Sequence, residues 1–79
     1  MRTHPEIKYI FAAVVAGEGL ERVGKRYGIH AATIRGLVYR RAERIRKANP
    51  GGHLNRQSTI ISFRNNKNYW LSLNDDLTN

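Results

Sequence analysis

Apolar side chains recur at helical spacing in the first part of the chain. The residues of this apolar face, spaced by three, four and seven positions, are Ile7, Ile10, Phe11 and Val14. Ahead of them, Thr3 and Glu6 stand where the two partners of a capping box stand, with Pro5 in the first helical turn. Gly17 follows and can adopt the left-handed conformation that ends many helices. The pattern predicts a helix over residues 4–16.

A second helix is predicted over residues 20–27. Its apolar face consists of Leu20, Val23 and Tyr27. Gly24 lies beside this face, where it would let another helix approach closely, although a merely tolerated helix glycine is the alternative. Gly28 is a natural helix stop. Ile29 is an apolar residue in the turn that follows, and we expect it to fill the angle between two helices.

A third and longer helix is predicted over residues 31–48. Its apolar side, within about 60° of Ile34 at about 100° per residue, holds Ile34, Leu37, Val38 and Ile45. The opposite side holds Ala32, Gly36, Tyr39, Arg40, Glu43 and Lys47. Arg41 falls near the apolar side, which favours a structural role for it. The sequence Asn-Pro-Gly-Gly at residues 49–52 then ends the helix.

The remainder of the chain changes character. Residues 58–63 (STIISF) and 69–73 (YWLSL) are rich in residues that favour strands, and they flank the polar residues 64–68. This arrangement predicts a β-hairpin with a five-residue loop, with a short C-terminal helix as the alternative. Residues 74–79 are expected to be frayed. Three aromatic residues of this region are expected in the core or in a dimer interface rather than in a base-stacking surface: Phe63, Tyr69 and Trp70.

These elements define a fold class. Two short helices joined by a turn of three or four residues containing glycine form a helix-turn-helix, whose second helix usually lies in the DNA major groove. We therefore expect a mostly α protein, with a three-helix helix-turn-helix domain over residues 1–52. A C-terminal β-hairpin over residues 53–79, in a winged-helix-like layout, packs on that domain or forms a dimer surface.

Charge narrows the class of partner. The 79 residues carry a formal net charge of +8. Between Arg22 and Lys47 there are nine Lys and Arg residues and a single acid, Glu43. Because this charge is concentrated on the predicted helix-turn-helix, it favours nucleic acid over a membrane surface or an acidic protein. A chain this short buries little surface, so a homodimer is also expected.

Other function classes find little support. The chain has no cysteine, which excludes disulfides and thiolate metal sites. Its three histidines lie far apart without metal-ligand spacing, and no phosphate-binding loop or nucleophile arrangement is present. No apolar run approaches the ~20 residues of a membrane span, and no signal peptide is evident. We expect a protein without enzyme activity, cofactor or membrane partner, in the cytoplasm of a bacterium or of a phage-infected host cell.

Residues 20–46 also resemble the helix-turn-helix of region 4 in primary bacterial sigma factors. That family carries a pattern close to L-E-x-V-G-K-x-F-x-V-x-x-x-x-I-R-x-I, and this chain reads LERVGKRYGIHAATIRGL over residues 20–37. The resemblance covers about a third of the chain. Its sharper part is Glu21, the run Val23-Gly24-Lys25 and the pair Ile34-Arg35. The resemblance implies a helix-turn-helix fold, a transcriptional setting and a role for Arg35 in contacting the DNA backbone.

The departures from that family lie at the positions that read DNA. In the family, the early positions of the second helix carry long polar side chains that recognise the promoter's −35 element. Here they are Ala31, Ala32 and Gly36, which cannot make the bidentate hydrogen bonds that distinguish bases. The resemblance therefore does not imply −35 specificity. The chain is also too short to be a whole sigma factor with its polymerase-binding regions.

The candidate DNA contacts lie on and just before the third predicted helix: His30, Ala32, Thr33, Arg35, Gly36, Tyr39, Arg40, Arg44 and Lys47. Thr33 would touch a thymine methyl or a phosphate, while Arg35 and Arg40 would hold phosphates or read guanine. His30 would reach a phosphate or cap the helix. The tip of the predicted hairpin is either a wing on the DNA or an ordinary turn: Arg64, Asn65, Asn66 and Lys67.

Three hypotheses on function follow. The first is a small sequence-selective regulator of transcription that binds double-stranded DNA, with the helix over residues 31–48 in the major groove. The second is a protein-interaction module that mimics sigma region 4 and binds RNA polymerase or an associated factor, which the small residues Ala31, Ala32 and Gly36 favour. The third is an accessory protein of DNA packaging or recombination. An origin in a phage or mobile element would suit the small size.

Overall fold

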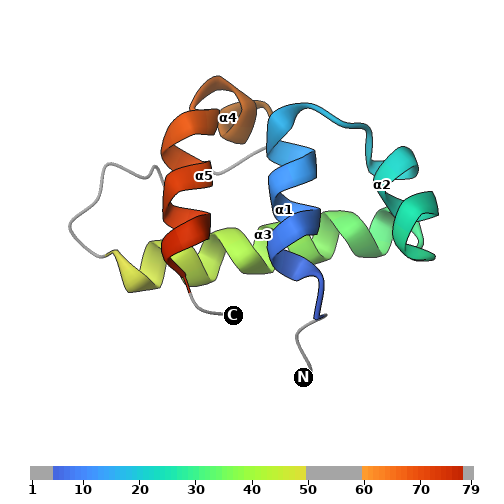
Figure 1. The fold of residues 1–79 in the computed structure, drawn as a ribbon, viewed down its shortest axis with the longest axis horizontal. Helices are drawn as coiled ribbons and strands as arrows, with labels where there is room; N and C mark the ends of the chain where they lie inside the picture. The colour runs from blue at the N-terminus through green and yellow to red at the C-terminus, as the bar shows by residue number, and fades with distance from the viewer. Residues whose placement is uncertain (1–4, 50–59, 78–79) are drawn as a thin grey trace.

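Every regular element in the described part of the chain is an α-helix. The computed structural model describes residues 5–49 and 60–77. The helices are α1 (Ile7–Ala16), α2 (Leu20–Tyr27), α3 (Ala31–Ala48), α4 (Ile60–Asn65) and α5 (Lys67–Asp76). Helices α1 and α5 lie side by side and both cross the long α3, while α2 packs near the N-terminal end of α3 (Figure 1). The short α4 lies beside one end of α1 and of α5.

The three helices predicted in the first half of the sequence are confirmed, with one boundary moved. Helix α1 begins at Ile7, after a turn at Pro5 and Glu6, rather than at residue 4. Glu6 occupies the N-cap position without a side-chain capping bond. The predicted capping partner Thr3 lies outside the described residues.

Close approach between α2 and α3 depends on two glycines. The α2 helix ends at Gly28, whose φ of 68° is the left-handed conformation that glycine adopts without strain. A Cβ on Gly24 would lie 2.4 Å from the carbonyl oxygen of Ile29, so only glycine fits there. The backbone N–H of Ile29 donates in turn to the carbonyl of Gly24 at 2.8 Å, and the Ile29 side chain packs against the core. The expected role of Ile29 is therefore confirmed, whereas the backbone that approaches Gly24 most closely is that of the turn at Ile29 rather than that of another helix.

The predicted C-terminal hairpin and winged-helix-like layout are wrong, because the described residues of this region form α4 and α5. The N–H of Asn66 donates to the carbonyl of Ser62 at 3.2 Å, and the N–H of Trp70 donates to the carbonyl of Asn66 at 3.1 Å. These are the i to i−4 bonds of helices. Helices α4 and α5, which meet at Asn66, bring Phe63 and Trp70 together in the core, and strand propensity yields to that packing.

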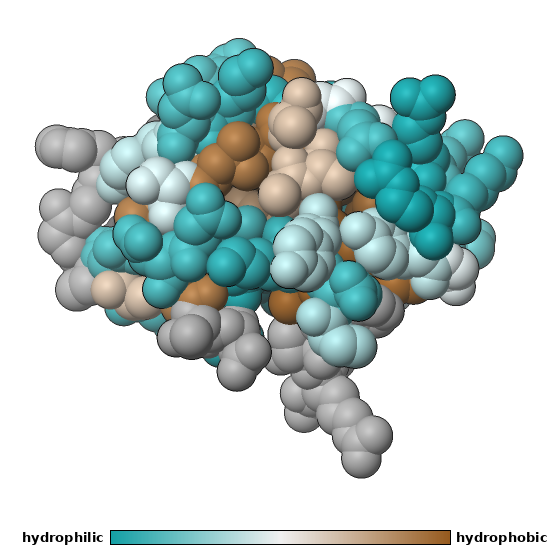
Figure 2. All heavy atoms as spheres, viewed as in Figure 1, coloured by the Kyte–Doolittle hydropathy of each residue, from teal (hydrophilic) through white to brown (hydrophobic). Residues whose placement is uncertain are grey.

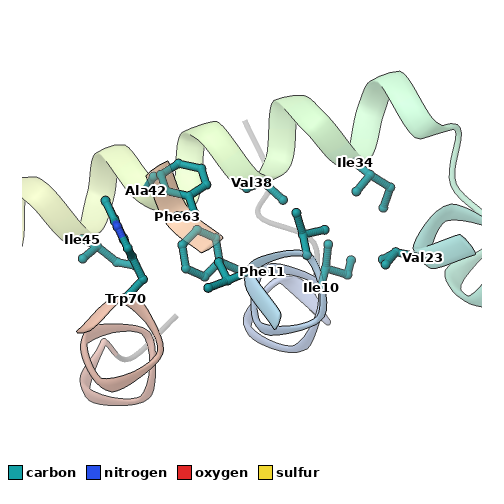
Figure 3. Close-up of a cluster of buried hydrophobic side chains, with 11 residues drawn as sticks. Ile10, Phe11, Val23, Ile34, Val38, Ala42, Ile45, Phe63 and Trp70 are labelled. Carbon is teal, nitrogen blue, oxygen red and sulfur yellow. The ribbon is translucent and has the colours of Figure 1, made fainter. Parts of the chain in front are cut away.

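Aromatic side chains from three helices form one end of the core. The ring centroid of Phe63 on α4 lies 4.7 Å from that of Trp70 on α5 and 5.7 Å from that of Phe11 on α1. Figure 3 shows these rings against the underside of α3, next to Ala42 and Ile45. Trp70 is 2% exposed. The prediction that Phe63 and Trp70 are core residues is confirmed, and the tail contributes to the same core as the helix-turn-helix.

A buried arginine joins α3 to α5. Arg41 is 1% exposed, and its guanidinium donates to the side chain of Asn74 at 2.8 Å, to the Asn74 carbonyl at 3.0 Å and to the Leu77 carbonyl at 3.1 Å. The Asn74 amide donates to the carbonyl of Lys8 on α1 at 3.0 Å. Burial, with a smaller effect of the nearby Arg44 charge, lowers the pKa of Arg41. The structural role expected for Arg41 is confirmed, whereas the expectation that the chain frays from residue 74 is wrong over residues 74–76.

Candidate nucleic-acid interface

The side of α3 that faces away from the core carries most of the predicted DNA contacts. Ile34, Val38 and Ile45 bury the opposite side. The exposed residues among the candidates are His30, Ala32, Thr33, Arg35, Arg40, Arg44 and Lys47, while Gly36 and Tyr39 are half-buried. At about 1.5 Å per residue, the 18 residues of α3 extend over roughly 27 Å. The structure thus brings the α3 candidates onto one exposed and mainly basic surface.

His30 starts this helix. Its Nδ1 accepts a hydrogen bond from the backbone N–H of Ala32 at 3.4 Å, and its backbone is extended, as at an N-cap. The expected capping role of His30 is confirmed. Contact between His30 and a phosphate stays a prediction.

Arg35 is held beside an aromatic ring that reaches back to the core. Its guanidinium carbon lies 5.7 Å from the centroid of the Tyr39 ring, and that ring lies 5.9 Å from the ring of Phe63. Phe63 in turn contacts Trp70. A cation over an aromatic face is attracted by the ring quadrupole. This arrangement fixes Arg35 at the flank of the exposed surface.

Arg40 occupies a different part of the surface. Its Nη2 lies 3.7 Å from the position that a Cβ on Gly36 would occupy. The guanidinium is therefore folded back by one helical turn toward the N-terminus of α3, in the direction in which helical side chains point. As a result, its donors lie over the small residue Gly36.

Helix α2 extends the basic surface. Arg22, Lys25 and Arg26 are exposed, and strongly hydrophilic side chains gather over α2 at the right of Figure 2. Arg26 binds the carboxylate of Glu18 through both terminal nitrogens, one of them at 3.0 Å. These hydrogen bonds lower the pKa of Glu18 and raise that of Arg26. The pair ties the α1–α2 connection to the end of α2.

The residues expected at a wing lie in the helical tail. Arg64 is in α4, where its guanidinium donates to the carbonyls of Val14 at 3.2 Å and Glu18 at 2.9 Å. The Val14 carbonyl lies near the C-terminal end of α1 and also accepts from the N–H of Gly17, while the Glu18 carbonyl lies in the connection between α1 and α2. Asn65, Asn66 and Lys67 are exposed around the junction of α4 and α5. Since no hairpin is present here, the wing geometry does not form.

Two structural roles were not found in the sequence. Asn74 bridges Arg41 to α1, and Arg64 caps α1 across 46 or more positions of sequence. The signal for Asn74 is its four-residue spacing from Trp70, which places both on the buried face of α5 and becomes readable once α5 is known to be a helix. Sequence spacing alone does not reveal such long-range pairs.

Comparison of the chain with protein-family profiles, with curated proteins and with solved structures found no match. Within residues 5–49 and 60–77, no group of three or more histidine and acidic side chains is arranged to hold a metal ion. In the same residues, no helix is both long and apolar enough to cross a membrane.

Proposed function

We propose that this protein is a small DNA-binding regulator of transcription that places α3 in the major groove of double-stranded DNA. The observation that carries the proposal is the exposed basic surface on α2 and α3, held on a helix-turn-helix whose turn is fixed by Gly24 and Gly28. The resemblance of residues 20–46 to sigma region 4 supports the same orientation. The cations of this surface would contact phosphates.

The distribution of charge favours this side of the molecule. Arg41 and Arg64 are engaged by carbonyls inside the fold, so they do not contribute to an outward-facing surface. Arg40, Arg44 and Lys47 are exposed along α3, where Glu43 is the acidic residue. A surface with this excess of cations attracts a polyanion and releases its counterions on binding.

A protein partner is the second candidate. Ala32 is exposed and Gly36 half-buried on the outward side of α3, and small residues allow close approach of another backbone as well as of DNA. RNA polymerase or an associated factor would then bind the surface, as in a mimic of sigma region 4. Under this alternative, affinity for duplex DNA would be weak and would not depend on the cations of α3.

The test is a titration of labelled duplex DNA of random sequence at about 50 and 200 mM salt. The variant changes Arg35 and Arg40 together to Ala. We expect a loss of several-fold affinity and a shallower salt slope, because two cations of the surface no longer release counterions from the DNA. Unchanged binding and slope would contradict the proposal, and co-purification with polymerase would then favour the second candidate.

A matched control keeps the change in net charge equal. Lys67→Glu lowers the charge by two units at the exposed start of α5, as the double change does on α3. We expect it to alter affinity and salt slope less than the double variant does. An equal effect would indicate that total charge, rather than the α3 surface, governs binding.

A further inference from the structure

We infer that Arg40 is the residue of α3 that reads a base, and that the base is a guanine in the major groove. This inference rests on the proposed function, since it assigns specificity within the same surface. The other exposed cations of α3 would contact phosphates instead.

The argument starts from what the outward side of α3 lacks. Ala32 and Gly36, one turn apart in the N-terminal half, have no group that can hydrogen-bond to a base edge. The small side chain of Ala32 allows the helix backbone to come close to the floor of a groove, and the missing side chain at Gly36 leaves room above the helix. A long side chain from a neighbouring turn can then supply the donors.

Arg40 is placed to do this. Its guanidinium lies over Gly36, with Nη2 3.7 Å from the position of a Cβ there. The side chain therefore delivers a planar set of N–H donors to the N-terminal half of α3, which is the part of a recognition helix that contacts bases. Such a fork pairs with the O6 and N7 acceptors of guanine through two hydrogen bonds.

The remaining cations of α3 are positioned differently. Arg35 is held over the Tyr39 ring at the flank of the surface, where a phosphate backbone would pass. Arg44 lies one turn beyond Arg40, toward the C-terminal end of α3. The methyl groups of Ala32 and Thr33 are exposed in the first turn of α3 and suit the methyl group of a thymine.

The experiment begins with selection of preferred duplexes from a random pool by the wild-type protein. Titrations then compare the selected duplex with one in which single G·C pairs are changed to A·T, and with one carrying 7-deazaguanine, which lacks the N7 acceptor. For the guanine that Arg40 reads, we expect the G·C change to weaken wild-type binding roughly 5- to 150-fold. The 7-deaza change should produce part of that loss.

Two variants identify the residue responsible. Arg40→Lys keeps the charge but loses the planar set of donors. The factors by which the G·C change and the 7-deaza change weaken binding should therefore both fall toward one. Arg44→Lys is the matched control one turn away on the same exposed side, and it should keep both penalties. Because Arg40 and Arg44 are exposed, neither change disturbs the core.

The outcomes separate this inference from the function on which it rests. Failure of the wild-type protein to bind any duplex would overturn both. Binding with equal affinity for all sequences, or with a guanine preference that Arg40→Lys leaves intact, would overturn only the assignment of Arg40. The same holds if Arg40→Lys and Arg44→Lys reduce the preference equally.

Discussion

Replacing Arg41 with Met should destabilise the fold more than any change to an exposed arginine of α3. The substitution removes three hydrogen bonds from a charged donor, one to the Asn74 side chain and two to carbonyls at the end of α5. Each such bond contributes about 1.5–3 kcal/mol. Part of this loss is offset because a buried cation no longer has to be desolvated, and one guanidinium nitrogen, Nη1, is buried without a hydrogen-bond partner.

The balance of these effects is a net loss of about 2–4 kcal/mol in the free energy of unfolding. A chain of this length has a total stability of roughly 4–12 kcal/mol, so the effect is large and easily measured. The assay is urea unfolding followed both by circular dichroism and by fluorescence of Trp70, which is the single tryptophan and lies in the core beside α3. The two probes should report the same transition.

The control for this prediction is Arg44→Met, which removes the same charge and shape from an exposed position of the same helix. It should change stability by at most about 0.5 kcal/mol. A double-mutant cycle of Arg41→Met with Asn74→Ala should give a coupling energy of about 1.5–3 kcal/mol. If Arg41→Met is no worse than Arg44→Met, or if the coupling is near zero, the network does not stabilise the fold as argued.

Three further predictions concern other parts of the fold. Gly24→Ala should destabilise by about 1–3 kcal/mol in urea unfolding despite the better helix propensity of alanine, because its Cβ would meet the Ile29 carbonyl at 2.4 Å; a stabilised variant would contradict the close approach. Arg64→Gln should lower stability by about 1–3 kcal/mol by removing the charged donor to the carbonyls of Val14 and Glu18, and a melting temperature equal to that of wild type would refute this role. The lowered pKa of Glu18 means that its pairing with Arg26 stabilises the fold fully above about pH 4.5 and is lost as the pH falls through the lowered value. Glu18→Gln should therefore reduce the difference in melting temperature between neutral pH and about pH 3, and an unchanged difference would show that the pair contributes nothing.

The first three helices and the turn between α2 and α3 were predictable because their signals are local. Apolar spacing marked the buried side of α3, and the positive φ of Gly28 matches the stop that its sequence position indicated. The same helical spacing placed Arg41 near the apolar side of this helix. In each case the relevant interactions lie within a helix or across one short turn, so nearby sequence carries enough information.

The C-terminal region could not be predicted in the same way. Short runs rich in β-branched and aromatic residues are compatible with a strand or with a buried helix, and periodicity over five or six residues does not separate them. The two helices place Phe63 and Trp70 together against Phe11. In sequence, Phe11 is 52 positions from Phe63 and 59 positions from Trp70. A hairpin is predicted from residues that are close in sequence, whereas this packing of Phe63 and Trp70 depends on Phe11 in the distant α1.

The sequence by itself determined the positions of the first three helices, the turn between α2 and α3, and the concentration of positive charge on them. Only the tertiary structure decided which groups the arginines contact. Arg41 and Arg64 are bound by carbonyls of distant helices, while Arg40 lies over Gly36 on the exposed side of α3. The physical reason is that a long cationic side chain has many acceptors within reach, and the fold selects among them by bringing carbonyls of distant segments close to some arginines and not to others.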